Sequence, residues 1–261
     1  MCMRRTLALA VIATWLSAAP SFANPVAVRF PEGSLHGFLS LRGPDGKTLA
    51  TGDLLQTVAA GRVTAKLVFK FSDGSISEET AVFSQRGHFK LIADHLVQKG
   101  PAFPRPLDLA IDGNTGEVTV RYTNDHGEEK VESERMELPA DLANGLITTL
   151  LKNLHATPKT TLSMVAATPK PRLVKLKITS AGRDSLSIGG TRRRAVHYVL
   201  KVDIGGIAGV VAPIVGKQPP DSHVWILQEE VPAFLRSQSP MFADGPLWQI
   251  ELIAPAWPSQ R

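Results

Sequence analysis

The fold is constrained most by a repeated alternation of apolar and polar residues between short turns. In residues 63–71 every second side chain is apolar, from Val63 through Leu67 to Phe71. A period of two predicts a β-strand with one buried face and one wetter face. Turn-forming residues follow at 72–75, and the alternation then resumes. Because such connections are short, successive strands are expected to pair antiparallel in a meander.

One stretch has helical spacing instead. After Pro139, which suits a first helical turn, Leu142, Leu146 and Leu150 recur on one face. Beyond residue 157 strand alternation returns, for example in residues 191–203. A helix between two sets of strands packs its leucines most simply on the concave side of the sheet.

The expected fold class is therefore mainly β with a minor α component. A single curved antiparallel sheet or half-barrel, wrapped around one or two helices, accounts for this order of elements. One β-rich domain over residues 24–261 is the preferred organisation, because single β-domains of this size are common. Two β-parts divided near residues 138–160 are the alternative.

Residues 1–23 have the composition of a signal peptide. Arg4 and Arg5 precede an apolar run over residues 7–16, and residues 21–23 supply the small side chains of a cleavage site. The apolar run is shorter than the ~20 residues of a membrane-spanning helix. We therefore expect a mature chain without a transmembrane segment, in the periplasm or outside the cell. The one cysteine, Cys2, leaves with the signal peptide, which excludes disulfides and thiol chemistry.

The charge of the chain argues against a nucleic-acid partner. Loss of Arg4 and Arg5 lowers the formal net charge of +5 by two, which is little for binding a polyanion. Acidic residues gather in residues 112–141 and basic residues in 152–201. This uneven distribution of charge fits two sheet faces that are exposed to solvent. The alternative is that it orients the protein near anionic lipid or polymer.

The sequence contains no familiar catalytic or metal-binding motif. There is no nucleophile elbow, no paired-histidine zinc helix and no phosphate-binding loop. Asp94 and His95 are the best candidates for an orienting carboxylate and its base, yet neighbours on a strand point to opposite faces. We therefore expect a non-enzyme, with no catalytic residue, no metal and no cofactor.

The most unusual segment covers residues 204–216, which carry no charge and are rich in glycine around Pro213. It could be a core plug, a lid over an apolar ligand, or a loop that touches a membrane. As a lid, its hinges would be Gly205, Gly206 and Gly216. Together with nearby aromatic residues it predicts a ligand-binding set of Ile207, Val210, Val211, Ile214, Tyr198, Trp225 and Trp248.

Three later motifs carry a resemblance to known proteins. These are Val224-Trp225-Ile226-Leu227, then residues 231–236, then Trp248-Gln249-Ile250-Glu251-Leu252. Their order resembles that of secreted bacterial β-rich proteins of unknown function, whose last strands close a curved sheet. The architecture is similar to that of periplasmic lipoprotein carriers, where a half-barrel with a helical lid holds acyl chains. The resemblance covers residues 195–252 and assigns no ligand-binding residue.

These features predict a non-enzymatic exported protein that binds or carries a hydrophobic, lipid-like ligand in a curved β-sheet cavity. The alternative is a structural or interaction protein of the cell envelope, which docks a protein partner through the apolar loop 204–216.

Overall fold

The computed structural model describes residues 25–253 except positions 125, 167, 204–218 and 230. Strands dominate this part of the chain, and one short helix, α1 (Ile147–Asn153), lies between two groups of them. The strands are β1 (Leu35–Arg42), β2 (Thr48–Ala59), β3 (Arg62–Phe71), β4 (Ile76–Arg86), β5 (His88–Lys99), β6 (Leu107–Asp112), β7 (Glu117–Thr123), β8 (Glu129–Arg135), β9 (Thr160–Ala166), β10 (Arg172–Ile188), β11 (Thr191–Asp203), β12 (Ser222–Leu227), β13 (Ala233–Ser239) and β14 (Trp248–Leu252).

All fourteen described strands belong to one antiparallel sheet, in the order β8 to β1 followed by β14 to β9. Two meanders of sequence neighbours, β1–β8 and β9–β14, are joined where β1 pairs with β14. At this junction Leu39 lies opposite Leu252 and Leu41 lies opposite Ile250. The first and last described strands in sequence, β1 and β14, therefore lie side by side in the middle of the sheet, and β8 and β9 form its edges.

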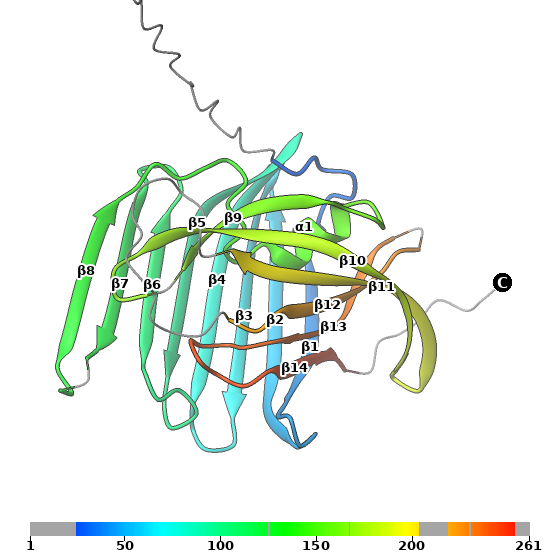
Figure 1. The fold of residues 1–261 in the computed structure, drawn as a ribbon. Coiled ribbons are helices and arrows are strands. Elements are labelled where there is room, and N and C mark those ends of the chain that lie inside the picture. Colours follow the sequence, from blue (N-terminus) through cyan, green and yellow to red (C-terminus); the bar gives the residue numbers. More distant parts are fainter. Residues whose placement is uncertain (1–24, 125, 167, 204–218, 230, 254–261) are drawn as a thin grey trace, which may run out of the picture.

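The sheet curves strongly around the helix. In Figure 1 strands β9–β11 cross in front of β4–β7 at a steep angle, with α1 close behind them. Leu150 and Leu151 of α1 are buried in one cluster that includes Leu109 of β6 and Leu176 of β10. The structure thus confirms the predicted fold class, a mainly β protein with a curved antiparallel sheet around a helix.

The helix is shorter than its leucine spacing predicts. Gly145 adopts a φ of +65°, which a right-handed helix cannot contain, so α1 begins after it. Leu142 instead forms a parallel bridge with Ser163 of β9. Leu142 and Leu146 are nevertheless buried with Leu150, because the segment before the helix packs into the same core.

A second packed surface lies on the opposite side of strands β10–β12. The pairing of β10 with β11 shifts between Ser180 and Gly182, where one extra residue forms a β-bulge. Beyond the bulge, residues of β10 that would have continued the inner face point outward. Leu186 and Ile188 consequently join Trp225 in a separate buried cluster.

Candidate functional site

A hollow of about 200 Å³ lies at the C-terminal end of α1. Its walls come from three parts of the chain that are far apart in sequence: the segment before β1, the end of α1 with the residues after it, and the residues after β12. The lining residues are Arg29, Phe30, Lys152, Leu154, His155, Ala156, Gln228, Glu229 and Pro232.

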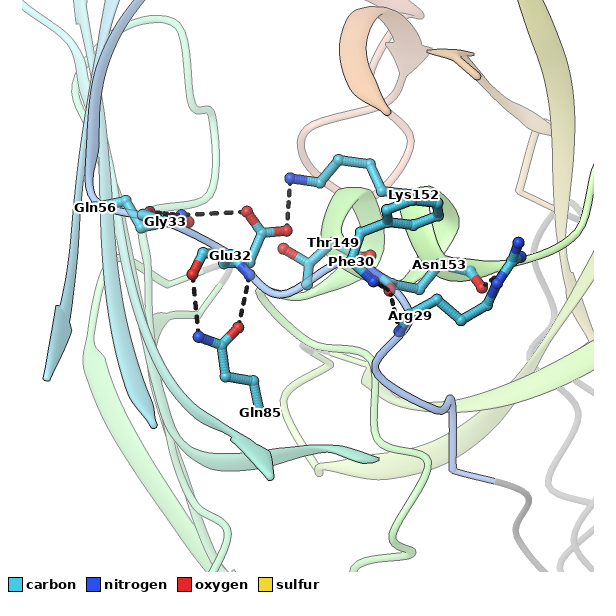
Figure 2. A network of polar contacts seen from close by, with 9 residues as sticks. All are labelled: Arg29, Phe30, Glu32, Gly33, Gln56, Gln85, Thr149, Lys152 and Asn153. Atoms are coloured by element: carbon cyan, nitrogen blue, oxygen red, sulfur yellow. Dashed lines mark hydrogen bonds and ion pairs between the residues drawn. The ribbon is translucent and has the colours of Figure 1, made fainter. Parts of the chain in front are cut away.

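Asn153, the last residue of α1, fixes the position of Arg29 and Phe30. Its side-chain Oδ1 accepts hydrogen bonds from the backbone N–H groups of Arg29 at 2.8 Å and Phe30 at 2.7 Å. Its Nδ2 donates to the backbone carbonyl of Thr149 at 2.9 Å. Figure 2 shows this amide between the helix and the N-terminal segment. Asn153 is buried, so the contact is a fixed part of the fold.

Glu32 anchors the same segment to the sheet. Its backbone exchanges two hydrogen bonds with the side-chain amide of Gln85, at 2.6 and 3.0 Å. One carboxylate oxygen accepts from Gln56 at 3.2 Å, and the other forms an ion pair with Lys152 at 2.5 Å (Figure 2). The side chains of Glu32 and Lys152 are 5% and 17% exposed. The charge of Lys152 is therefore compensated inside the protein.

Arg29 has no such carboxylate. Its guanidinium lies 3.4 Å from the carbonyl oxygen of Asn153 and 3.5 Å from Nδ1 of His155, and it stacks over the ring of Phe30 at 5.4 Å. Among the residues that the structure describes, no Asp or Glu forms an ion pair with it. Glu229, on the opposite wall, is 4.0 Å from Arg193. The hollow is thus electropositive on the Arg29 side.

Tyr198 lies behind these walls and connects two of them. Its fully buried ring belongs to the main core, and its hydroxyl donates to the carbonyl oxygen of His155 at 3.2 Å. Gln228 donates to the same hydroxyl at 2.5 Å and to the carbonyl oxygen of Leu154 at 3.2 Å. Burial raises the pKa of Tyr198 to about 12, so the hydroxyl stays protonated at neutral pH.

The other predicted ligand-binding residues lie elsewhere. Trp225 is in the outer cluster with Leu186, and Trp248 is in a third cluster with Phe71 and Phe103. The structure therefore does not bring Tyr198, Trp225 and Trp248 together. Ile207, Val210, Val211, Ile214 and the predicted hinges Gly205, Gly206 and Gly216 fall outside the described residues, so the lid and docking roles of this segment stay predictions.

Sequence reasoning missed Arg29, His155 and Gln228. No motif joins them, because the fold alone places these three segments side by side. The one available signal was Tyr198, whose alternation with Val196 and Leu200 indicated an inward-facing side chain.

Asp94 and His95 diverge, as strand alternation predicts. Asp94 points into the core and is 2% exposed, while His95 Nε2 lies 2.9 Å from Oδ1 of Asp108 on the exposed face. Within the described ranges no group of three or more His, Cys, Asp or Glu side chains surrounds a common point. The same ranges contain no helix that is long and apolar enough to cross a membrane.

Comparisons with known proteins give structural likenesses alone. No protein-family model matches the chain, and no curated protein matches its sequence. One similar solved structure is a β-barrel-like protein of a domain of unknown function from Brucella abortus, with 8% identity, 85% of this chain and 98% of that chain covered, and a TM-score of 0.43. Another is the hypothetical lipoprotein YmcC from Escherichia coli, with 11% identity, 85% of each chain covered and a TM-score of 0.36. Both are β-rich bacterial proteins to which this chain is similar.

Proposed function

We propose that this chain is an exported, non-enzymatic protein of the cell envelope that binds a lipid-like ligand through its anionic group at the Arg29 hollow. The observation that carries the proposal is the uncompensated guanidinium of Arg29 beside an apolar wall. Arginine recognises carboxylate and phosphate oxygens through paired N–H donors. Phe30, Leu154 and Pro232 supply the apolar surface that an attached hydrocarbon would contact.

The size of the hollow restricts which part of the ligand enters it. At about 200 Å³ it is smaller than the roughly 300–1,000 Å³ of a site that encloses a whole drug-sized molecule. We therefore assign it to the head group and the first carbons. Asn153 and Glu32 hold the Arg29 segment against the helix and sheet, so the cation is preorganised for binding.

Isothermal titration of the protein with dodecanoate and dodecyl phosphate, below their micellar concentrations, tests the proposal. Dodecyl maltoside is the uncharged probe and dodecyltrimethylammonium the cationic one. The wild type is expected to bind both anions and neither other probe. Arg29→Gln should weaken anion binding by about tenfold or more, since a charge-assisted contact contributes roughly 1.5–3 kcal/mol.

The matched control is Arg86→Gln. Arg86 is an exposed arginine that donates to the carbonyl oxygen of Ala60 at 2.7 Å, away from the hollow. This variant should bind like the wild type. Equal binding by Arg29→Gln and wild type, or no preference for the anionic probes, would overturn the proposal.

A further inference from the structure

A carboxylate without a partner lies on the face of the sheet that is turned towards α1. Glu79 of β4 stands opposite Leu67 of β3 and Leu96 of β5. Asp94 lies on the same face of β5, and a Cβ at Gly145, just before α1, would be 2.8 Å from its Oδ1. This face is therefore the inner one. In the part of the chain that the structure describes, Glu79 forms no ion pair and no hydrogen bond.

The apolar core is interrupted around Glu79. Leu67 packs at the margin of the cluster that contains Phe69, whereas Leu96 packs at the margin of the main cluster with Leu109. Both of these leucines are only partly buried, although Phe69 and Leu109 are 1% and 2% exposed. The inner face can therefore be reached where the two clusters meet. Glu79 lies at this point, between the two leucines, and is itself partly exposed.

Two buried oxygen atoms beside Glu79 also lack a hydrogen-bond donor. Among the described residues, Oδ1 of Asp94 and Oε1 of Gln98 have no partner, and each of these two residues is 2% exposed. Both lie two positions from Leu96 on the same face of β5, so each stands diagonally across from Glu79. Nε2 of Gln98 donates to the carbonyl oxygen of Met241 at 2.8 Å, which fixes the amide. A buried acceptor without a partner costs free energy until a donor binds to it.

The two carboxyl groups differ in charge at neutral pH. Burial, together with the charge of Glu79, raises the pKa of Asp94 to about 8, so Asp94 is neutral. Burial raises the pKa of Glu79 as well, and a cation bound beside it would oppose that shift by favouring the charged form. A metal ion fits poorly, because no third His, Cys, Asp or Glu joins the pair within the described ranges. A cation that donates hydrogen bonds would satisfy both the charge and the unpaired oxygens.

We propose that the inner face at Glu79 binds a primary ammonium group that is attached to an apolar chain. Glu79 supplies the negative charge, and Asp94 and Gln98 supply two neutral acceptors, since a protonated carboxyl group keeps an acceptor oxygen. A primary ammonium has three N–H donors, one for each of these side chains. Leu67 and Leu96 supply the apolar surface that the attached chain would contact. The site shares no residue with the Arg29 hollow.

Isothermal titration with dodecylamine, below its micellar concentration, tests the proposal. Its amine is protonated at neutral pH, as the amine of lysine is. Ethylamine has the ammonium without the chain, and dodecyltrimethylammonium has the charge and the chain without N–H donors. We expect dodecylamine to bind and the other two probes not to bind. Glu79→Gln should weaken dodecylamine binding by about tenfold or more, because hydrogen bonds to charged groups are among the strongest.

Glu78→Gln is the matched control. Glu78 is the neighbouring carboxylate on the opposite face of β4, where it pairs with Lys66 at 2.7 Å, so this variant should bind dodecylamine like the wild type. Thermal unfolding verifies that both variants are folded. Methyl NMR locates the ligand, because the signals of Leu67 and Leu96 should shift on binding. No binding of dodecylamine, equal binding by folded Glu79→Gln and wild type, equally tight binding of dodecyltrimethylammonium, or unshifted leucine signals would overturn the proposal.

Discussion

The carboxyl group of Asp94 is buried at a position that is unfavourable for its charged form. It projects from β5 into the core, is 2% exposed, and its Oδ1 has no hydrogen-bond partner among the described residues. Burial, together with the charge of Glu79 on β4, raises its pKa to about 8. Burial also raises the pKa of Glu79, although that side chain keeps partial exposure. Neutral Asp94 is thus the form that suits the fold.

This shift makes stability depend on pH. The unfolded chain releases the Asp94 proton near 3.8, whereas the folded protein keeps it to about 8. The folded state therefore holds the extra proton between these values, so stability falls as pH rises through the window and levels off above it. Asp94→Asn should flatten this dependence and stabilise the protein at pH ~8 by a few kcal/mol.

Urea unfolding between about pH 5 and pH 9 measures the effect. The control is Glu78→Gln, which removes a neighbouring carboxylate that faces solvent and pairs with Lys66; its profile should follow the wild type. If the Asp94→Asn and wild-type profiles stay parallel, Asp94 is not the group responsible.

The start of α1 depends on a close approach that Gly145 permits. A Cβ at this position would lie 2.5 Å from Cβ of Ala81 and 2.8 Å from Oδ1 of Asp94, and φ is +65°. Gly145→Ala should therefore destabilise the protein by about 2–4 kcal/mol, through backbone strain plus overpacking. Gly74→Ala is the control, since its φ is +86° but no atom lies within 4 Å; it should cost about 1 kcal/mol. Thermal unfolding measures the loss of stability in each variant. Equal losses of stability would show that the close approach to Ala81 and Asp94 does not contribute to the effect of Gly145→Ala.

Gly145 also shows where sequence reasoning stops. Alternation in residues 63–71 predicted β3 and its buried Phe69, because a strand face can be read from local spacing. The leucine spacing of residues 142–154 predicted one helix over this stretch, yet the left-handed conformation of Gly145 makes the helix begin late, at Ile147. The pairing of β1 with β14 and the meeting of Arg29 with His155 join distant segments. No local pattern contains such information.

The two edges of the sheet are protected differently. At β9 the preceding segment covers the edge: the side-chain amide of Asn144 exchanges hydrogen bonds with the backbone of Val165 at 3.0 and 2.8 Å, and the N–H of Ala143 donates to Ser163 at 2.9 Å. At β8 no described segment lies alongside, and nearly every residue is exposed. The charged side chains of β8 protect this open edge against pairing with another strand, as is common for edge strands that no segment covers.

Glu132 and Glu134 are the decisive charges on β8, because they extend the inner face of the sheet. They lie opposite Val120 and Val118, both fully buried. Glu132→Val with Glu134→Val would give the open edge an apolar face next to unpaired backbone groups. We expect the double variant to associate edge to edge, with a mass that rises with protein concentration in size-exclusion chromatography with light scattering.

The control removes two negative charges away from the edge, by Glu78→Val on β4 with Glu117→Val on β7. Both of these strands are paired on each side, so this variant should keep the mass of the wild type although its net charge changes equally. Association of both variants would assign the effect to net charge. Association of neither would mean that the backbone of β8 is inaccessible. Association of the β8 variant alone is the result that follows from a curved sheet with one covered edge and one edge guarded by charge.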